Sequence, residues 1–216
     1  MINTSFFQKH VVIVGKGPTF KRQKIMNEKT VIALNTAAIE TECNFIHLID
    51  FDVYEKIRDV LLVKTINLII PLYPHIDNNS TNKNVFELLG DDEVFNEIVD
   101  EKRVLLYNLE NSNRFIEGYP IVSNSYFSAE VVVKLVCQFN ISKITLIGVD
   151  GGYQYSKCFD KKTLLANGHE SFDIQFKGIQ LATYKSNVEL NHISYPEPIL
   201  VNINCFFNNK IAFDVF

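Results

Sequence analysis

The chain has 216 residues, of which 47% are hydrophobic and 21% are charged, a balance typical of a globular protein rather than a disordered or fibrous one. This length favours a single domain with one sizeable core. The formal net charge of −4 argues against non-specific nucleic-acid binding, which requires a dense basic surface.

Targeting and redox signals are weak. No stretch is long and apolar enough to span a bilayer, and no basic stretch precedes the first apolar run, so we expect no signal peptide. The four cysteines are far apart and lack metal-ligand spacing, which favours reduced thiols. We therefore expect a cytoplasmic protein, either free or peripheral at the inner membrane, without a transmembrane segment.

Six short apolar runs follow one another along the chain and predict strands. Continuous apolar runs of this kind are typical of strands buried on both faces of a parallel sheet. They span residues 10–14, 30–34, 45–49, 66–70, 104–107 and 143–149.

Two helices are predicted after the middle of the chain. Apolar residues recur at helical spacing over 127–140, where Ser125 or Ser128 is a candidate N-terminal cap, and over 172–185. Residues 74–84 are polar and predict a loop, and residues 189–216 predict short extended pieces such as 199–201 and 210–213. Strands alternating with helices predict an α/β fold with a mostly parallel sheet. We expect one Rossmann-like, nucleotide-binding domain covering residues 1–216.

Several predicted strands end in glycine or polar residues: Gly15, Asn35, Asp50 and Asp150. The carboxyl ends of parallel strands share one edge of the sheet, where ligands bind. The first of these turns, Gly15-Lys16-Gly17-Pro18-Thr19, leads into a basic segment and suits a phosphate, because glycine lets the backbone approach an anion. It matches neither G-x-G-x-x-G nor a P-loop, and a plain tight turn explains it about equally well.

Two further groups are candidates for chemistry. Asp50 and Asp52 alternate at a strand end and have the spacing of a divalent-metal motif, although such pairs are common by chance. His169 lies in a polar turn before a predicted helix, where a histidine with an ordinary pKa near ~6.5 suits a general base. An ordinary surface histidine is the alternative interpretation.

Together these motifs resemble the bacterial sialyltransferases of glycosyltransferase family 42, over roughly residues 8 to 200. Each motif has a counterpart in that family, in the same order. The counterparts are Gly15-Lys16-Gly17-Pro18-Thr19, Leu34-Asn35, Phe127-Ser128-Ala129, Gly148-Val149-Asp150, and Gly168-His169 with Asp173-Ile174.

The resemblance implies a GT-A-like variant of the fold and an inverting, metal-independent transfer of a nonulosonic acid, such as sialic acid, from its CMP donor to a glycan hydroxyl. It implies no cofactor beyond the CMP-sugar substrate. Members of that family often assemble, so a homo-oligomer is one alternative, and the oligomeric state stays open.

The resemblance also assigns roles to individual residues. His169 matches the general base, and Tyr153 and Tyr155 are the candidates for two tyrosines that hydrogen-bond the leaving phosphate. The residues assigned to nucleotide binding are Gly15, Lys16, Gly17, Pro18, Thr19, Asn35, Ser128, Ala129 and Asp150.

The sequence departs from the family in places, and two other functions stay open. Lys16 replaces a family asparagine and suits a phosphate as a point charge. Phe127 and Ala129 replace a threonine and a glycine, and an expected arginine before this turn is absent. The first alternative is a 6-hydroxymethylpterin diphosphokinase-like or motility-accessory-type domain. The second alternative is a non-catalytic nucleotide- or glycan-binding module.

Overall fold

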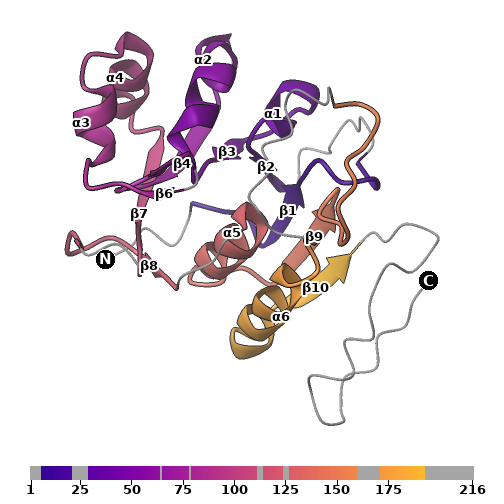
Figure 1. The fold of residues 1–216 in the computed structure, drawn as a ribbon. Coiled ribbons are helices and arrows are strands. Elements are labelled where there is room, and N and C mark those ends of the chain that lie inside the picture. Colours follow the sequence, from indigo (N-terminus) through magenta and orange to yellow (C-terminus); the bar gives the residue numbers. More distant parts are fainter. Residues whose placement is uncertain are drawn as a thin grey trace.

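The fold is built on one parallel sheet that runs through the middle of the molecule (Figure 1). A computed structural model describes residues 6–20, 29–63, 65–77, 79–110, 114–123, 127–159 and 171–192. Within them, eight strands pair in the order β10-β9-β1-β2-β3-β4-β7-β8, and every pairing in this sheet is parallel. The strands are β1 (His10–Val14), β2 (Thr30–Leu34), β3 (Phe45–His47), β4 (Asn67–Pro71), β7 (Val104–Leu109), β8 (Ile121–Val122), β9 (Lys143–Ile147) and β10 (Glu189–His192).

The order of the strands reverses once, between β1 and β9. From β1 the chain adds β2, β3, β4, β7 and β8 outward in one direction, and then returns to place β9 and β10 on the other side of β1. At such a reversal the loops leaving the two neighbouring strands diverge to opposite faces of the sheet. They leave a crevice at the carboxyl ends of the strands, where ligands bind in open α/β sheets.

Helices cover both faces of the sheet, as Figure 1 shows. One face carries α5 (Ser128–Val136) and α6 (Gln175–Lys185). The other face carries α1 (Ala37–Glu40), the 3-10 turn η1 (Phe51–Val53), α2 (Tyr54–Val63), α3 (Val85–Leu89) and α4 (Glu93–Asp100).

Each face of the sheet has its own apolar core. Ile13 of β1 packs in the core under α5 and α6, whereas Ile46 of β3 packs in the core under α1, α2 and α4. Because both faces are covered, both sets of alternating strand residues are buried. This burial explains why the strands read as continuous apolar runs in the sequence.

The predicted α/β fold and its parallel sheet are confirmed, with corrections of detail. The strand expected over 45–49 is shorter, and β8 and the helices α1 to α4 were not predicted. The expected loop over 74–84 contains a small antiparallel hairpin of β5 (His75–Ile76) and β6 (Asn79–Ser80). Of the expected extended tail, β10 forms its start, and the pieces at 199–201 and 210–213 lie outside the described residues.

The start of α5 also differs from expectation. Phe127 occupies the N-cap position and Ser128 is the first helical residue, so the serine does not cap the helix. Ser125, the other candidate cap, lies outside the described residues. A phenylalanine side chain cannot accept a hydrogen bond from the first-turn N–H groups, so the N-cap residue itself does not cap these donors.

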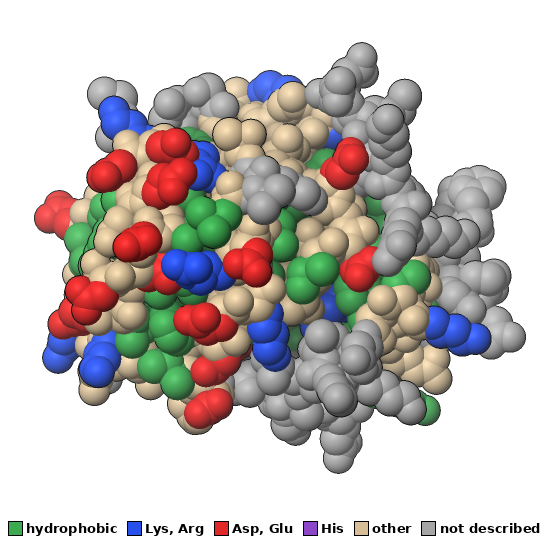
Figure 2. Space-filling view, turned by 90° about the horizontal axis from the view of Figure 1, so that it is seen from above, with side chains coloured by type: hydrophobic (Ala, Val, Ile, Leu, Met, Phe, Trp, Pro, Cys, Tyr) green, Lys and Arg blue, Asp and Glu red, His purple; other side chains and the backbone are tan. Residues whose placement is uncertain are grey.

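The surface over α1 to α4 carries charges of both signs. Figure 2 shows acidic side chains gathering on the side of this face that holds α3 and α4. Within the described residues, no helix has the length and apolarity needed to cross a lipid bilayer.

Candidate functional site

A cavity opens at the reversal point, above the carboxyl ends of β1, β2 and β9. Residues that follow these strands line it together with the first turn of α5 and the segment around Tyr155 and Phe172. The predicted site residues among its lining are Gly15, Lys16, Gly17, Asn35, Ser128, Ala129, Asp150 and Tyr155.

Two glycines allow the turns after β1 and β9 to touch. The Gly15 N–H donates to Ile147 O at 2.8 Å, and the Gly17 N–H donates to Gly148 O at 2.6 Å. A Cβ atom on Gly15 would collide with the carbonyl oxygen of Gly148, and Gly148 itself has a φ of +63°. The glycines are therefore needed for backbone contact, and this role does not depend on a ligand.

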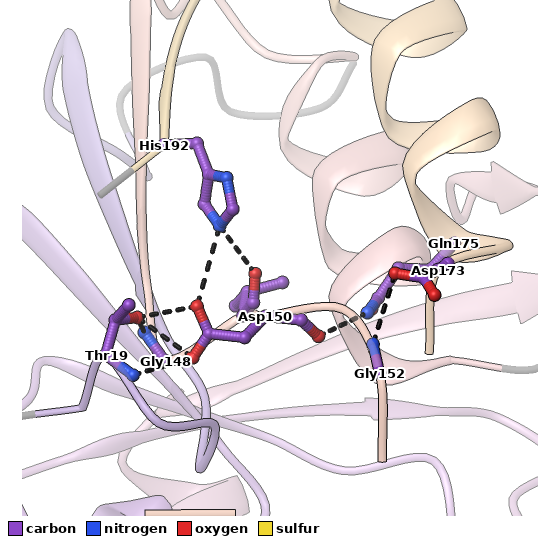
Figure 3. Close-up of polar contacts among 8 residues, drawn as sticks. Thr19, Gly148, Asp150, Gly152, Asp173, Gln175 and His192 are labelled. Atoms are coloured by element: carbon purple, nitrogen blue, oxygen red, sulfur yellow. Dashed lines mark hydrogen bonds and ion pairs between the residues drawn. The ribbon is translucent and has the colours of Figure 1, made fainter. Parts of the chain in front are cut away.

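Hydrogen bonds between Thr19 and Asp150 hold these two turns together (Figure 3). The Thr19 N–H donates to Asp150 Oδ2 and its hydroxyl donates to Oδ1, both at 2.8 Å. The same hydroxyl oxygen accepts from the Gly148 N–H at 2.8 Å. Asp150 therefore lines the cavity with its carboxylate already engaged by Thr19, and it acts as an anchor of the first turn.

His192 of β10 extends this network on the side away from Thr19 (Figure 3). Its Nε2 lies 2.9 Å from Val149 O, which requires the proton on Nε2, and 3.7 Å from Asp150 Oδ1. No role was predicted for this histidine. Its packing and hydrogen bond tie the edge strand to the turn after β9.

A third set of contacts brings the segment 171–175 to the cavity. The Gly152 N–H donates to Asp173 Oδ1 at 3.1 Å, and the Phe172 N–H donates to Gly152 O at 2.7 Å. The side-chain Nε2 of Gln175 donates to Asp150 O at 3.4 Å (Figure 3). These bonds place Phe172 and Gln175 in the lining, and the Phe172 ring packs edge-on against Tyr155.

The wall after β2 has a different character. Asn35 has a φ of +53°, a left-handed conformation that asparagine tolerates better than most residues. Its Nδ2 donates to Ser128 Oγ at 3.4 Å, which directs Oδ1 away from Ser128. Within the described residues, Asn35 Oδ1 and Thr36 Oγ1 are buried and have no hydrogen-bond partner. Both residues line the cavity, so these atoms can bind hydroxyl or amine donors of a ligand.

Cationic side chains also line the cavity. Lys16 lies with its Nζ 5.2 Å from the centre of the Tyr155 ring, a cation–π geometry. Burial, and then repulsion by Lys56, lower the pKa of Lys16 to about 8. Burial raises the pKa of Tyr155, so its hydroxyl keeps its proton at neutral pH. The cavity lining thus includes an ammonium group, a phenol and the start of a helix, which are donor groups suited to an anion.

The structure does not bring every predicted residue to the cavity. Tyr153 is 75% exposed and is absent from the lining, whereas Tyr155 faces the cavity. Pro18 and Thr19 are not among the lining residues, and Thr19 is buried and hydrogen-bonded to Asp150. His169 lies outside the described residues, so its role stays a prediction.

Other lining residues were not predicted as site residues. Phe127 and Gly148 belong to the predicted motifs, but Thr36, Lys56, Gln154, Phe172 and Gln175 carry no signal in the sequence that marks them. Asp50, which was predicted at a strand end and as part of a metal motif, also lines the cavity. Its partner in that motif, Asp52, instead accepts a hydrogen bond from the Asp77 N–H at 2.7 Å. No group of three potential metal ligands occurs among the described residues.

The fold and the cavity define a class, the Rossmann-like α/β proteins with a candidate ligand site at the reversal point of a parallel sheet. Comparisons with protein-family models, with characterised proteins and with solved structures find no match to this chain.

Proposed function

We propose that this protein transfers a nonulosonic acid, such as sialic acid, from a CMP donor to a hydroxyl group of a glycan. The supporting observation is that one cavity contains the glycine turn, Asn35, the start of α5 and Tyr155. The resemblance to the bacterial sialyltransferases assigns these same groups to the donor. These groups come from parts of the chain as far apart as Gly15 and Tyr155, so it is the fold that brings them together.

The proposed reaction breaks the bond between the anomeric carbon of the donor sugar and its phosphate oxygen, and the electron pair leaves with CMP. Negative charge then grows on the phosphate. In this proposal the Lys16 ammonium, the first N–H groups of α5 and the Tyr155 hydroxyl stabilise that charge. Preorganised donors of this kind commonly provide a large part of catalysis.

The acceptor hydroxyl attacks the anomeric carbon from the opposite face and gives up its proton, which we assign to His169. A positioned base of this kind typically contributes ~100- to 10,000-fold. His169 precedes Phe172, a residue of the cavity lining, by three positions in the chain. The proposal requires the His169 imidazole to reach the acceptor hydroxyl at this cavity.

The test is to measure CMP release from CMP-N-acetylneuraminate with and without lactose-type acceptors. We expect acceptor-dependent release. His169→Ala should lower transfer by ~100-fold or more while the Kd of CMP changes less than about two-fold. Tyr155→Phe should lower kcat by about ten-fold, because one donor to the phosphate is lost. Tyr119→Phe, which alters a partly exposed tyrosine outside the cavity lining, is the matched control.

Other outcomes would replace the proposal. Turnover that requires ATP and magnesium would indicate a diphosphokinase. Binding of CMP without turnover on any acceptor would indicate a non-catalytic module. Unchanged transfer by the His169→Ala variant would contradict the assigned base.

A further inference from the structure

We infer that the cavity has two separate anion-binding positions, one at Lys16 and one at Lys56, and that Lys56 binds the carboxylate of the donor sugar. The identity of the ligand rests on the proposed function. A CMP-nonulosonic acid carries two anionic groups, a phosphodiester and a sugar carboxylate. Donors with neutral sugars carry no such carboxylate.

The first position combines Lys16 with the start of α5. The Lys16 side chain is partly buried and is held over Tyr155, so its ammonium has a defined place in the cavity. Phe127 and Ser128 begin α5 at the same cavity, and the side chain of the N-cap residue Phe127 makes no capping hydrogen bond. An ammonium and the N–H groups at a helix start together suit a phosphate.

The second position comes from a different part of the fold. Lys56 lies in the first turn of α2, on the face of the sheet opposite α5, and reaches the cavity from there. After burial, repulsion by Lys56 is the second cause of the lowered pKa of Lys16, which agrees with both lysines lining one cavity. The two lysines thus reach one cavity from two different elements, the turn after β1 and helix α2.

The acidic groups of the cavity limit where an anion can bind. Asp150 has its carboxylate oxygens engaged by Thr19. Asp50 lies in the lining six residues before Lys56 and repels any anion beside it. A sugar carboxylate on this side of the cavity therefore needs the cation of Lys56, whereas sugar hydroxyls are compatible with Asp50 and Asn35.

The inference makes Lys56 a specificity-determining residue. A charge-assisted hydrogen bond to a carboxylate is lost when the carboxylate is esterified, because the ester has no charge. Lys56 should therefore distinguish a donor with a free carboxylate from its methyl ester. Substitution of Lys16 should weaken binding of the free acid and of its methyl ester equally, because both ligands keep the phosphate.

The experiment measures the Kd of CMP, CMP-N-acetylneuraminate and its carboxyl methyl ester by calorimetry, without acceptor, for the full chain and four variants. The wild-type protein should bind the free acid about ten-fold more tightly than the ester. Lys56→Gln should remove this preference and leave the Kd of CMP within about two-fold, and Lys56→Arg should restore the preference. Lys16→Gln should weaken all three ligands by about ten-fold. Lys83→Gln, which alters an exposed lysine outside the cavity lining, should change nothing.

The outcomes separate the two hypotheses. If Lys56→Gln keeps the preference for the free acid, or weakens the acid and the ester equally, the inference is overturned while the proposed function stands. If the folded wild-type protein binds no cytidine nucleotide, the proposed function fails and the inference fails with it.

Discussion

The cavity has two walls that differ in how their polar groups are used. The β1–β9 wall consists of residues 15–17 and 148–150, and hydrogen bonds of Thr19 with Asp150 and Gly148 hold its two turns together. The β2–β3 wall consists of Asn35, Thr36 and Asp50. Within the described residues, Asn35 Oδ1 and Thr36 Oγ1 of this wall are buried without a hydrogen-bond partner. The first wall is therefore built for rigidity, whereas the second has polar atoms left to bind a ligand.

The largest effect is expected where the two turns touch on the β1–β9 wall. Gly15→Val places side-chain atoms against the Gly148 carbonyl, where even a Cβ atom collides with backbone. We expect the free energy of unfolding to fall by about 3 kcal/mol or more, measured by urea denaturation. A variant as stable as the wild-type protein would show that these turns can separate, which contradicts the rigid-wall interpretation.

A smaller loss of stability should follow when the anchor of the same wall is removed. Thr19→Val leaves the Gly148 N–H and part of the Asp150 carboxylate without their partner, so we expect a loss of about 2 kcal/mol. The control is Thr183→Val in α6, a buried threonine whose hydroxyl bonds only to Ile179 O and Gln180 O of its own helix among the described residues. If the free energy of unfolding fell equally in the two variants, the result would contradict a special role of Thr19 in this wall.

On the β2–β3 wall the effect should appear in binding rather than in stability. Asn35→Gly preserves the left-handed backbone and removes the buried amide oxygen, so we expect unfolding to change by less than about 1 kcal/mol. The affinity for CMP should fall by about ten-fold, measured by calorimetry. Asn187→Gly is the matched control, because this exposed residue also has a φ of +53° and lies outside the cavity lining. Unchanged CMP affinity of Asn35→Gly would contradict the ligand-binding role of this wall.

The smallest predicted effect is the pH dependence of CMP binding. The pKa of Lys16 is about 8, so its ammonium loses its proton as the pH rises through that value. The affinity for CMP should therefore be highest near pH 7 and fall about five-fold by pH 9, because the phosphate stays anionic while Lys16 becomes neutral. Lys16→Arg should flatten this profile by keeping the charge. An affinity that rises over the same range in the wild-type protein would contradict a phosphate contact at Lys16.

The difference between the walls also explains what the sequence could predict. The parallel sheet could be predicted, because strands buried on both faces leave continuous apolar runs such as residues 10–14 and 143–149. The glycine turn and Asn35 could be predicted as site residues because they stand directly after such runs. The pairing of Thr19 with Asp150 could not be predicted, since the two residues lie 131 positions apart and are brought together only by the strand order.

Other site residues could not be predicted from the sequence for a similar reason. Lys56 and Phe172 reach the cavity through the placement of α2 and of the segment 171–175, which depends on tertiary contacts. Tyr153 and Tyr155 differ by two positions in an irregular segment, where no periodicity indicates which side chain faces inward. The contact of Tyr155 with Phe172 settles its orientation in the structure.

The most direct test of the central claim is a crystal structure of the protein with CMP bound. We predict the phosphate at Lys16 and the first turn of α5, with a hydroxyl or amine group of the nucleotide donating to Asn35 Oδ1. A nucleotide bound at another surface, with the cavity containing only water, would contradict the account.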